Sequence, residues 1–297
     1  MSCPICGNHE FWMIPAALDL QAEHLRSTPG EHSGYEWRLC RRCGNAYPSA
    51  PPDVHILQEL WALNRTDSGA SVSEQTKTWA YRRAIAKAGA ERSYRLFAPL
   101  VANRFGRFLD IACGLGETVR AFAANGWDAE GVDADPSTEP FHRELGIRAR
   151  IGQFETIDVG TEYDLIHIAH AIYFITDPMR FMRIVRERLS PRGIFCVVLA
   201  DFLASTDLSL PSYVHTFFPT GSSMRYALAC AGFETVLCKR LSGSIFIAAR
   251  PATMAAPPTV SPSRIRFLYQ TKALRYALVG RPYLLLRRII KRLVGRR

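Results

Sequence analysis

The sequence feature that most restricts the fold is the segment FLDIACGLGETV at residues 108–119. An apolar run meets an aspartate and two glycines at alternate positions, and the chain resumes with helix-compatible residues. This pattern predicts a strand, a tight turn and a helix. Strand-like and helix-like segments alternate to about residue 250, which predicts a parallel sheet with helices on both faces. The last two strand-like segments, FETVLCK and SIFIAAR, can pair as an antiparallel hairpin and complete a seven-stranded sheet.

The glycine turn restricts which ligand this sheet can hold. A phosphate-binding P-loop requires a lysine after its last glycine, and none follows Gly116. A dinucleotide-binding turn has a third glycine where Val119 stands, so that hypothesis is weakened but stays open. Asp133 closes the strand-like segment EGVD, and its carboxylate can accept two hydrogen bonds from ligand hydroxyls. Glycine at such a turn lets backbone amides approach a ligand closely.

The same residues carry a family resemblance. The D-x-A-x-G-x-G spacing of residues 110–116 resembles motif I of class I S-adenosylmethionine-dependent methyltransferases, with alanine in place of the first of three glycines. The similarity covers residues 105–250 and implies a Rossmann-like α/β fold that binds S-adenosylmethionine. By this resemblance Gln153 and Phe154 would flank the adenine, and His170 would lie beside the sulfonium. The implied cofactor-binding residues are Asp110, Ala112, Gly114, Gly116, Asp133, Ala134, Gln153, Phe154 and His170.

Half of the eight cysteines form a metal-binding pattern. Two C-x-x-C-G pairs, Cys3 with Cys6 and Cys40 with Cys43, can each present two thiolates from one tight turn. Four thiolates complete a tetrahedral zinc site and leave no open position, which predicts a structural rather than a catalytic zinc. A thioredoxin-like redox pair would not explain the second knuckle. The remaining cysteines lie in apolar surroundings and are predicted to be small core residues: Cys113, Cys196, Cys230 and Cys238.

Breaks in composition divide the chain. YPSAPPD closes the cysteine segment, and RPATMAAPPTVSPS is predicted to be an extended, solvated linker. No apolar run reaches the roughly 20 residues of a membrane-spanning helix, and the start does not resemble a secretory signal, so we expect a cytoplasmic protein. The predicted units are a zinc-ribbon-like module at 1–50, a helical leader at 51–104, the cofactor-binding domain at 105–250, a linker at 251–263 and a tail at 264–297.

The tail carries the whole charge excess of the chain. The net charge is +10, and residues 264–297 contain eleven Lys and Arg and no acidic residue. From Pro282 the sequence PYLLLRRIIKRLVGRR places apolar and basic residues on opposite faces of a helix. We therefore expect a basic amphipathic tail that holds the protein on an anionic membrane surface, at the inner face. A helix packed on the catalytic domain and an RNA-binding tail remain alternatives.

The methyl acceptor is predicted from a second resemblance. A zinc ribbon ahead of a methyltransferase domain resembles glycan and deoxysugar methyltransferases, and also some ribosomal RNA guanine methyltransferases. The segment SYVHTFFPTGSSMRYALACAGFETV resembles the glycan-associated enzymes, which makes His215 the candidate general base with Tyr213 nearby. A purely structural role for His215 is equally compatible with the sequence. The expected acceptor is a hydroxyl or carbon of a sugar, nucleotide-linked or in a lipid-linked glycan, or a related small molecule.

Two other functions remain open. A near-neutral body makes nucleic acid an unlikely partner, although Arg38, Arg41 and Arg42 form a local basic group beside the second knuckle. Methylation of ribosomal RNA is therefore the alternative. A non-catalytic scaffold at a membrane surface is the third hypothesis, and the intact Gly114, Gly116 and Asp133 argue against it.

Overall fold

The computed structural model describes residues 2–15, 36–50, 72–102, 105–201, 203, 215–280 and 282, and these residues form two sheets. The small antiparallel sheet contains β1 (Phe11–Ile14), β2 (Trp37–Cys40) and β3 (Ala46–Pro48). The large sheet has the order β6 (Arg148–Ile151), β5 (Asp128–Asp133), β4 (Arg107–Ile111), β7 (Tyr163–Ala169), β8 (Leu189–Ala200), β10 (Ser244–Pro251) and β9 (Phe233–Leu241).

The large sheet confirms the predicted fold. β6, β5, β4, β7 and β8 pair in parallel, whereas β10 pairs antiparallel with both β8 and β9. Helices follow the parallel strands, as the alternating sequence pattern predicts. They are α2 (Val72–Phe97), α3 (Glu117–Ala123), α4 (Glu139–Leu145), α5 (Pro178–Arg188), α6 (Gly221–Cys230) and α7 (Pro262–Arg275), with short helical turns at Ala98–Leu100, Pro136–Thr138, Ile172–Phe174 and Tyr276–Gly280.

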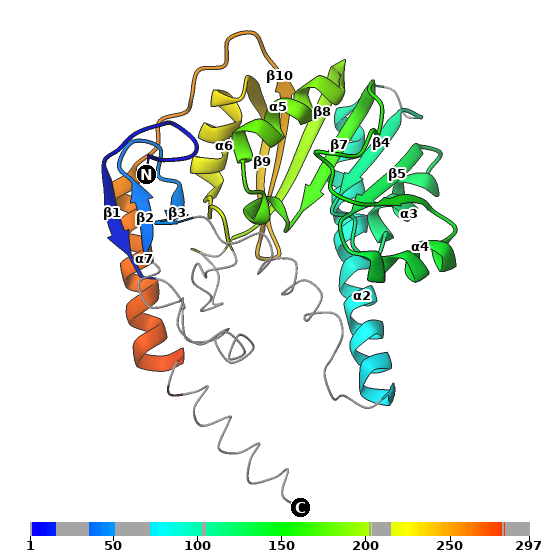
Figure 1. Cartoon of the computed structure of the whole chain (residues 1–297), viewed down its shortest axis with the longest axis horizontal. Coiled ribbons are helices and arrows are strands. Elements are labelled where there is room, and N and C mark those ends of the chain that lie inside the picture. The colour runs from blue at the N-terminus through cyan, green and yellow to red at the C-terminus, as the bar shows by residue number, and fades with distance from the viewer. Residues whose placement is uncertain are drawn as a thin grey trace, which may run out of the picture.

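Two apolar cores lie on opposite faces of the large sheet. Successive residues of a strand point to opposite faces, so Phe108 belongs to one core and Leu109 to the other. On the first face α2 and α3 cover the sheet, and the rings of Phe108 and Phe122 stack with their centroids 3.7 Å apart. On the second face lie α5 and α6, with Phe181 and Met224 fully buried. Figure 1 shows the sheet between these helices.

A buried polar chain crosses the first face. Asp110 and His167 are register partners on β4 and β7, and the Asp110 carboxylate accepts a 2.7 Å hydrogen bond from His167 Nδ1. His167 Nε2 lies 3.1 Å from the Ser93 hydroxyl on α2. All three side chains are buried, where an unpaired polar group would be costly. The structure therefore gives Asp110 a supporting role between strand and helix, and its predicted cofactor contact stays a prediction.

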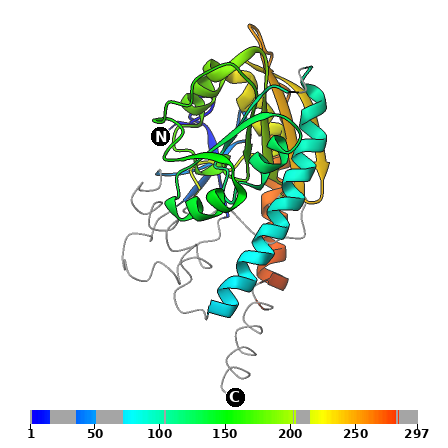
Figure 2. The ribbon, with the colours of Figure 1, turned by 90° about the vertical axis from the view of Figure 1, so that its right-hand side faces the viewer.

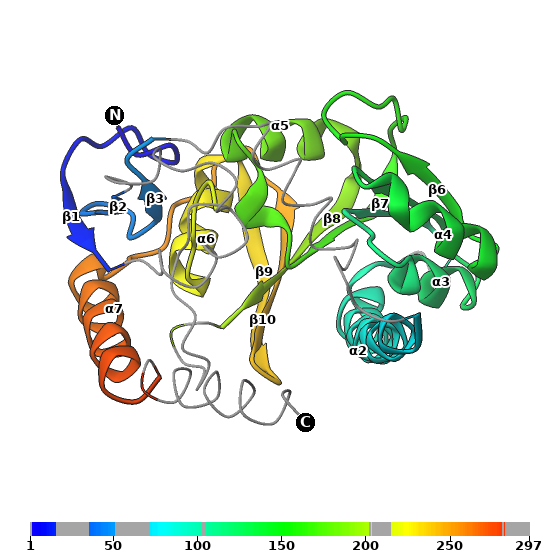
Figure 3. The ribbon, with the colours of Figure 1, turned by 60° about the horizontal axis from the view of Figure 1, so that its bottom comes forward.

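The zinc-ribbon-like module lies beyond α6 and beside α7, at the opposite end of the sheet from α3 and α4 (Figures 1 and 3). Ile265 of α7 packs against the second knuckle, because an added Cβ at Gly44 would lie 2.6 Å from its Cδ1 atom. Arg41 of the module and Arg266 of α7 each lie with Cζ 5.1 Å from the Trp12 ring centroid. The first part of the tail is thus a helix docked on the body, in agreement with the alternative of a packed helix for this part of the tail.

The helical leader is α2, whose N-terminal half projects beyond the sheet in Figures 1 and 2. Residues 51–71 and the tail segment 283–297 lie outside the described residues. No helix that the structure describes combines the length and apolar character needed to cross a bilayer. The prediction for the isolated cysteines is half right, because Cys113 and Cys196 are buried whereas Cys230 and Cys238 are exposed.

Candidate functional site

The glycine turn joins the carboxyl end of β4 to α3. Ala112, Gly114 and Gly116 have φ values of 55°, 55° and 80°, the left-handed region that glycine adopts without strain. Ala112 holds the same conformation in spite of its side chain, at the position where the family has a glycine. A Cβ added at Gly114 would meet no atom within 4 Å, so the turn is open on that side. At Gly116 a Cβ would collide with Ile147, so this glycine serves close packing.

Two side chains from neighbouring segments hold this turn in place. The Asp133 carboxylate, at the end of β5, accepts hydrogen bonds from the amides of Gly114 at 2.6 Å and Asp135 at 2.9 Å. His142 of α4 is buried and its Nε2 lies 2.7 Å from the Gly114 carbonyl oxygen. A carboxylate oxygen can accept two hydrogen bonds, so the amide contacts are compatible with ribose hydroxyls at Asp133. No motif or periodicity in the sequence points to His142.

The other predicted cofactor residues divide into exposed and buried. Ala134 and Gln153 are exposed at the same carboxyl edge, after β5 and β6. Phe154 is buried, and its ring packs edge-on against Phe181 of α5 with centroids 5.5 Å apart. This placement makes Phe154 a core residue in the structure. The open turn, the carboxylate at the end of β5 and the exposed strand edge fit an adenosyl ligand, with Gly114, Asp133 and Ala134 as the residues that would hold it.

His170 and His215 lie on either side of Tyr173. His170 follows β7 with a left-handed backbone, φ 54°, and its Nδ1 lies 3.2 Å from the Tyr173 hydroxyl. The His215 ring meets the Tyr173 ring edge-on at 5.7 Å between centroids and stacks on Phe174 at 5.2 Å. The structure therefore brings together two histidines that are 45 positions apart in sequence. Tyr213 lies outside the described residues.

Burial by the surrounding protein shifts the pKa values of His170 and Tyr173. Solvent reaches the edge of His170, but the surrounding protein lowers the pKa of its imidazole below the usual 6.5, and the charges of His167 and Arg92 add to the effect. A lowered pKa keeps this imidazole neutral at pH 7. Burial raises the pKa of Tyr173 to about 12, so its hydroxyl stays protonated. Sequence reasoning did not find Tyr173 or Phe174 because their roles depend on a segment far along the chain.

The segment from His215 to Ser223 is hydrogen-bonded to the cysteine module, the zinc-ribbon-like module of residues 1–50. The amide of Phe218 donates a 2.7 Å hydrogen bond to the Ala46 carbonyl, and the Phe218 ring lies edge-on to Trp37. The buried Asn45 donates from Nδ2 to the Ser223 carbonyl at 3.1 Å. At the other end, Thr216 donates to the carbonyl of Tyr173 through its amide at 2.9 Å. The module and the β7 edge therefore hold the segment from two sides.

The four predicted cysteines form one cluster. The Sγ atoms of Cys3, Cys6, Cys40 and Cys43 lie within 4.8 Å of one another, and the Cys3–Cys43 and Cys6–Cys40 pairs are 3.5 Å apart. Bonds of about 2.3 Å from four sulfurs to one tetrahedral ion place the sulfurs at comparable separations. Asn45 Nδ2 lies 3.5 Å from Cys43 Sγ, and the Arg42 amide 3.4 Å from Cys40 Sγ. The donor set and its geometry fit a tetrahedral thiolate metal site.

The pKa shifts within the cysteine cluster also favour binding of a cation. Contact with Cys3 lowers the pKa of Cys6 to about 7. The hydrogen bond to Cys40, those to the other two cysteines and burial raise the pKa of Cys3 above its ordinary value. Four adjacent thiols cannot all ionise unless a positive charge compensates them.

Comparisons with known proteins give the class of the central domain. The family described as "Methyltransferase domain" matches residues 74–237, more than half of the chain. No curated protein sequence matches.

Three solved structures are similar to this chain in fold. The CcbJ methyltransferase from Streptomyces caelestis is 17% identical, with TM-score 0.46, covering 57% of this chain and 90% of that one. The PH0226 protein from Pyrococcus horikoshii OT3 is 18% identical, with TM-score 0.47 and coverage of 65% and 98%. The glycopeptide N-methyltransferase MtfA complexed with S-adenosylhomocysteine is 16% identical, with TM-score 0.44 and coverage of 56% and 86%.

The sheet order, the glycine turn and the carboxylate after β5 define a class I methyltransferase fold. The chain belongs to the methyltransferase-domain family and is an S-adenosylmethionine-dependent methyltransferase with a zinc-ribbon-like cysteine cluster at its N-terminal end. This assignment removes the hypothesis of a non-catalytic scaffold. The family match begins at residue 74 and ends at residue 237. The cysteine cluster therefore lies before it, and β10 and α7 lie after it.

Asp133 provides a direct test of the cofactor site. Asp133→Asn keeps the size of the side chain but removes its charge, and Asp133→Ala removes both acceptor oxygens. We expect calorimetry to show S-adenosylmethionine binding weakened at least about tenfold by either change, because hydrogen bonds to a carboxylate contribute more than about 1.4 kcal/mol. Asp158→Ala, which removes an exposed carboxylate after β6, should leave the affinity unchanged. Equal affinity in wild type and both Asp133 variants contradicts the assignment.

Proposed function

We propose that the enzyme transfers a methyl group to a hydroxyl or carbon of a sugar, either nucleotide-linked or in a lipid-linked glycan. The observation that carries this proposal is the cluster of His170, Tyr173 and His215 at the carboxyl edge of β7. S-adenosylmethionine supplies an activated methyl group on a positively charged sulfur. The protein's part is to place an acceptor atom at this edge and to accept the proton that the acceptor loses.

Proton transfer favours the two imidazoles. Methylation of a hydroxyl, or of a carbon next to a carbonyl, requires a base within hydrogen-bond reach. His170 has a lowered pKa and is therefore neutral at pH 7, and His215 is half-buried in an aromatic surround. His215 is the proposed general base, because its ring comes from the segment that also joins the cysteine module. Tyr173 is the proposed positioning residue between the two rings.

The aromatic surround supports a sugar over RNA. Rings offer an apolar face to the C–H surface of a sugar, while the nearby imidazole and hydroxyl groups bind its hydroxyls. RNA binding would require free cations near the site. Of the basic group beside the second knuckle, Arg38 lies over Phe11 at 4.4 Å and Arg41 over Trp12 at 5.1 Å. Ribosomal RNA remains the alternative acceptor that the assay below distinguishes.

A transfer assay with labelled methyl groups tests the acceptor. Wild type is incubated with separate pools of nucleotide-linked sugars, lipid-linked glycans and ribosomal RNA, and we expect label in one of the first two. His215→Ala should lower kcat by about 10² to 10⁴, the usual loss on removing a general base, without changing S-adenosylmethionine affinity. His9→Ala, on an exposed part of the cysteine module, is the matched control and should have no effect.

A pH profile separates the two histidines. If His170 were the base, activity would fall with an acid limb below pH 6.5, because its pKa is lowered, and that limb would be lost in His170→Gln. If His215 is the base, as proposed, the acid limb of the wild type should persist in His170→Gln. Label appearing only in RNA, or unchanged kcat in His215→Ala, contradicts the proposal.

We also propose that the ion held by the four cysteines is zinc. Cys40→Ser should reduce zinc from about one ion per chain to well below that, because one of four ligands is lost. The unfolding temperature should fall by about 5 °C or more, since metal binding is coupled to folding of the module. Cys238→Ser, at an exposed cysteine outside the cluster, should change neither quantity. Elemental analysis and thermal unfolding measure both, and zinc content unaffected by Cys40→Ser contradicts the assignment.

A peripheral membrane location is proposed for the C-terminal part. Phe267, Leu274 and Leu278 are 63%, 60% and 69% exposed, and their spacing of seven and four places them along one side of α7 and its extension. The sequence beyond residue 280 continues with alternating pairs of apolar and basic residues. This combination of apolar and cationic side chains suits the headgroup layer of an anionic membrane.

Vesicle flotation tests the membrane proposal. Wild type should float with vesicles that contain anionic phosphatidylglycerol and should not float with pure phosphatidylcholine. A chain that ends at Gly280 retains α7 on the cysteine module but loses seven of the eleven basic residues of the tail, and it should lose most of the binding. The double variant Phe267→Ser, Leu274→Ser should weaken binding with the charges intact. Flotation unaffected by both changes contradicts the proposal.

A further inference from the structure

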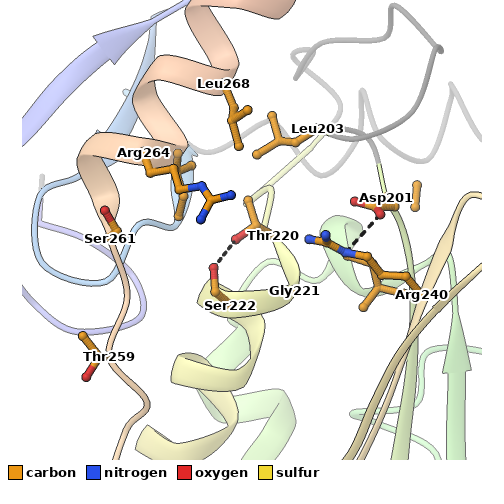
Figure 4. Close-up of a pocket in the computed structure, with 13 residues that line it drawn as sticks. Asp201, Leu203, Thr220, Gly221, Ser222, Arg240, Thr259, Ser261, Arg264 and Leu268 are labelled. Atoms are coloured by element: carbon orange, nitrogen blue, oxygen red, sulfur yellow. Dashed lines mark hydrogen bonds and ion pairs between the residues drawn. The ribbon is translucent and has the colours of Figure 1, made fainter.

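A cavity of about 490 Å³ has no lining residue from the glycine turn, and about half of its lining comes from the chain beyond the family match, which ends at residue 237. Its walls come from the end of β8, the start of α6, the β9–β10 hairpin and the start of α7. Figure 4 shows it between α6 and α7, with Arg264 on one side and Arg240 on the other. Its volume is in the range of sites for small organic ligands.

The cavity has a cationic character. In Figure 4 the guanidinium groups of Arg264 and Arg240 point toward each other from opposite walls, with Thr220 between them. Arg240 pairs with the nearly buried Asp201 at 3.2 Å, whereas no carboxylate among the described residues pairs with Arg264. Two converging guanidinium groups against one carboxylate leave a net positive charge. An anion between them would relieve their repulsion and form charge-assisted hydrogen bonds.

The remaining lining suits an anionic group attached to an organic body. Thr220, Ser222 and Ser261 add hydroxyl groups to the lining, and those of Thr220 and Ser222 lie 3.1 Å apart in a hydrogen bond to each other. Thr220 and Ser223 already cap the first amides of α6, so the cationic character rests on the arginines and not on the helix end. Apolar side chains cover the rest of the surface: Leu203, Ile245, Ile265 and Leu268.

The cavity is next to the proposed transfer site. Ala200, which lines the cavity, also contacts the Tyr173 hydroxyl through its backbone. His215 and Thr220 belong to one short segment, with the histidine in the aromatic cluster and the threonine in the cavity wall. The aromatic cluster and the cavity therefore share the Ala200 end of β8 and the segment 215–220, and an acceptor held in the cavity is proposed to reach the histidines.

We infer that this cavity binds the phosphate or diphosphate of the methyl acceptor, with Arg264 and Arg240 as the anion-binding residues. The inference rests on the proposed function, in which the acceptor is a nucleotide-linked or lipid-linked sugar, and it names the residues that would bind the phosphate or diphosphate of that acceptor. Planar guanidinium groups bind anionic oxygens in pairs, and two such groups on opposite walls suit a phosphate or diphosphate, whose several oxygens can face both walls, better than a neutral ligand.

Calorimetric titration with inorganic pyrophosphate tests the cavity without any methyl transfer. Wild type should bind saturably, and Arg264→Gln should bind at least tenfold more weakly. Arg264→Lys keeps the charge but loses the two-pronged geometry and should be intermediate. Arg275→Gln removes an equal charge from the exposed last turn of the same helix, outside the cavity, and should match wild type. All three changes are at exposed positions, so thermal unfolding should be unchanged.

Two further arms identify the source of the phosphate. Uridine diphosphate in solution should compete with pyrophosphate if the acceptor is nucleotide-linked. Phosphatidylcholine vesicles doped with a polyprenyl phosphate should bind wild type more than Arg264→Gln if the acceptor is lipid-linked. In the transfer assay, Arg264→Gln should raise KM for the phosphorylated acceptor with little change in kcat, because the residue holds the acceptor away from the reacting atoms.

The results separate this inference from the proposed function. No saturable binding of pyrophosphate to wild type, or equal binding by wild type and Arg264→Gln, overturns the anion site even if sugars are methylated. Pyrophosphate binding that depends on Arg264, together with label found only in RNA, supports the cavity as an anion site and overturns its role in sugar recognition.

Discussion

The hydrogen bond from the Phe218 amide to the Ala46 carbonyl joins the cysteine module, which lies outside the family match, to the segment of the methyltransferase domain that contains His215. Ala46 follows the second cysteine knuckle, and Phe218 follows the proposed base His215. The Tyr269 hydroxyl of α7, buried so that its pKa is raised, lies 3.5 Å from the Phe218 carbonyl oxygen. Phe218 is thus bound through its amide to the cysteine module and through its carbonyl to α7. Each contact is therefore one of several attachments of a segment that belongs to the proposed active site.

This arrangement gives the cysteine cluster a role in positioning although it is closed to catalysis. A short, three-stranded sheet has little apolar core of its own, and a bound ion can supply the missing stability. Asn45 connects the two functions directly, since its Nδ2 group contacts both the Cys43 sulfur and the Ser223 carbonyl of α6. Through Asn45 the second cysteine knuckle therefore also holds the start of α6, where Thr220 borders the cavity.

Local patterns in the sequence predicted the parts of the structure that depend on local chemistry. The period of apolar residues and the glycine turn gave the sheet, its final hairpin and the position of Asp133. The C-x-x-C-G spacing gave the cysteine cluster, because each pair is one turn. The packing of Phe154 on Phe181 was not predicted, since periodicity does not say which face a residue after a strand will occupy, and its contact with the adenine stays a prediction. The contact of Gly44 with Ile265 joins positions 221 residues apart and has no local signature.

The same limit explains why the sequence left the contacts of the tail open. Basic and apolar residues at helical spacing describe a helix with two faces, but they do not say what either face contacts. In α7 the side with Ile265 and Tyr269 is buried against the cysteine module, while Phe267 and Leu274 remain exposed on the other side. Arg264 lies at the border, at the mouth of the cavity. A helix bound to the body on one side and to a membrane on the other would hold the cavity close to the bilayer surface, which is where the phosphate of a lipid-linked sugar is found. The lipid-linked acceptor is therefore the form of the substrate that would satisfy both proposals at once.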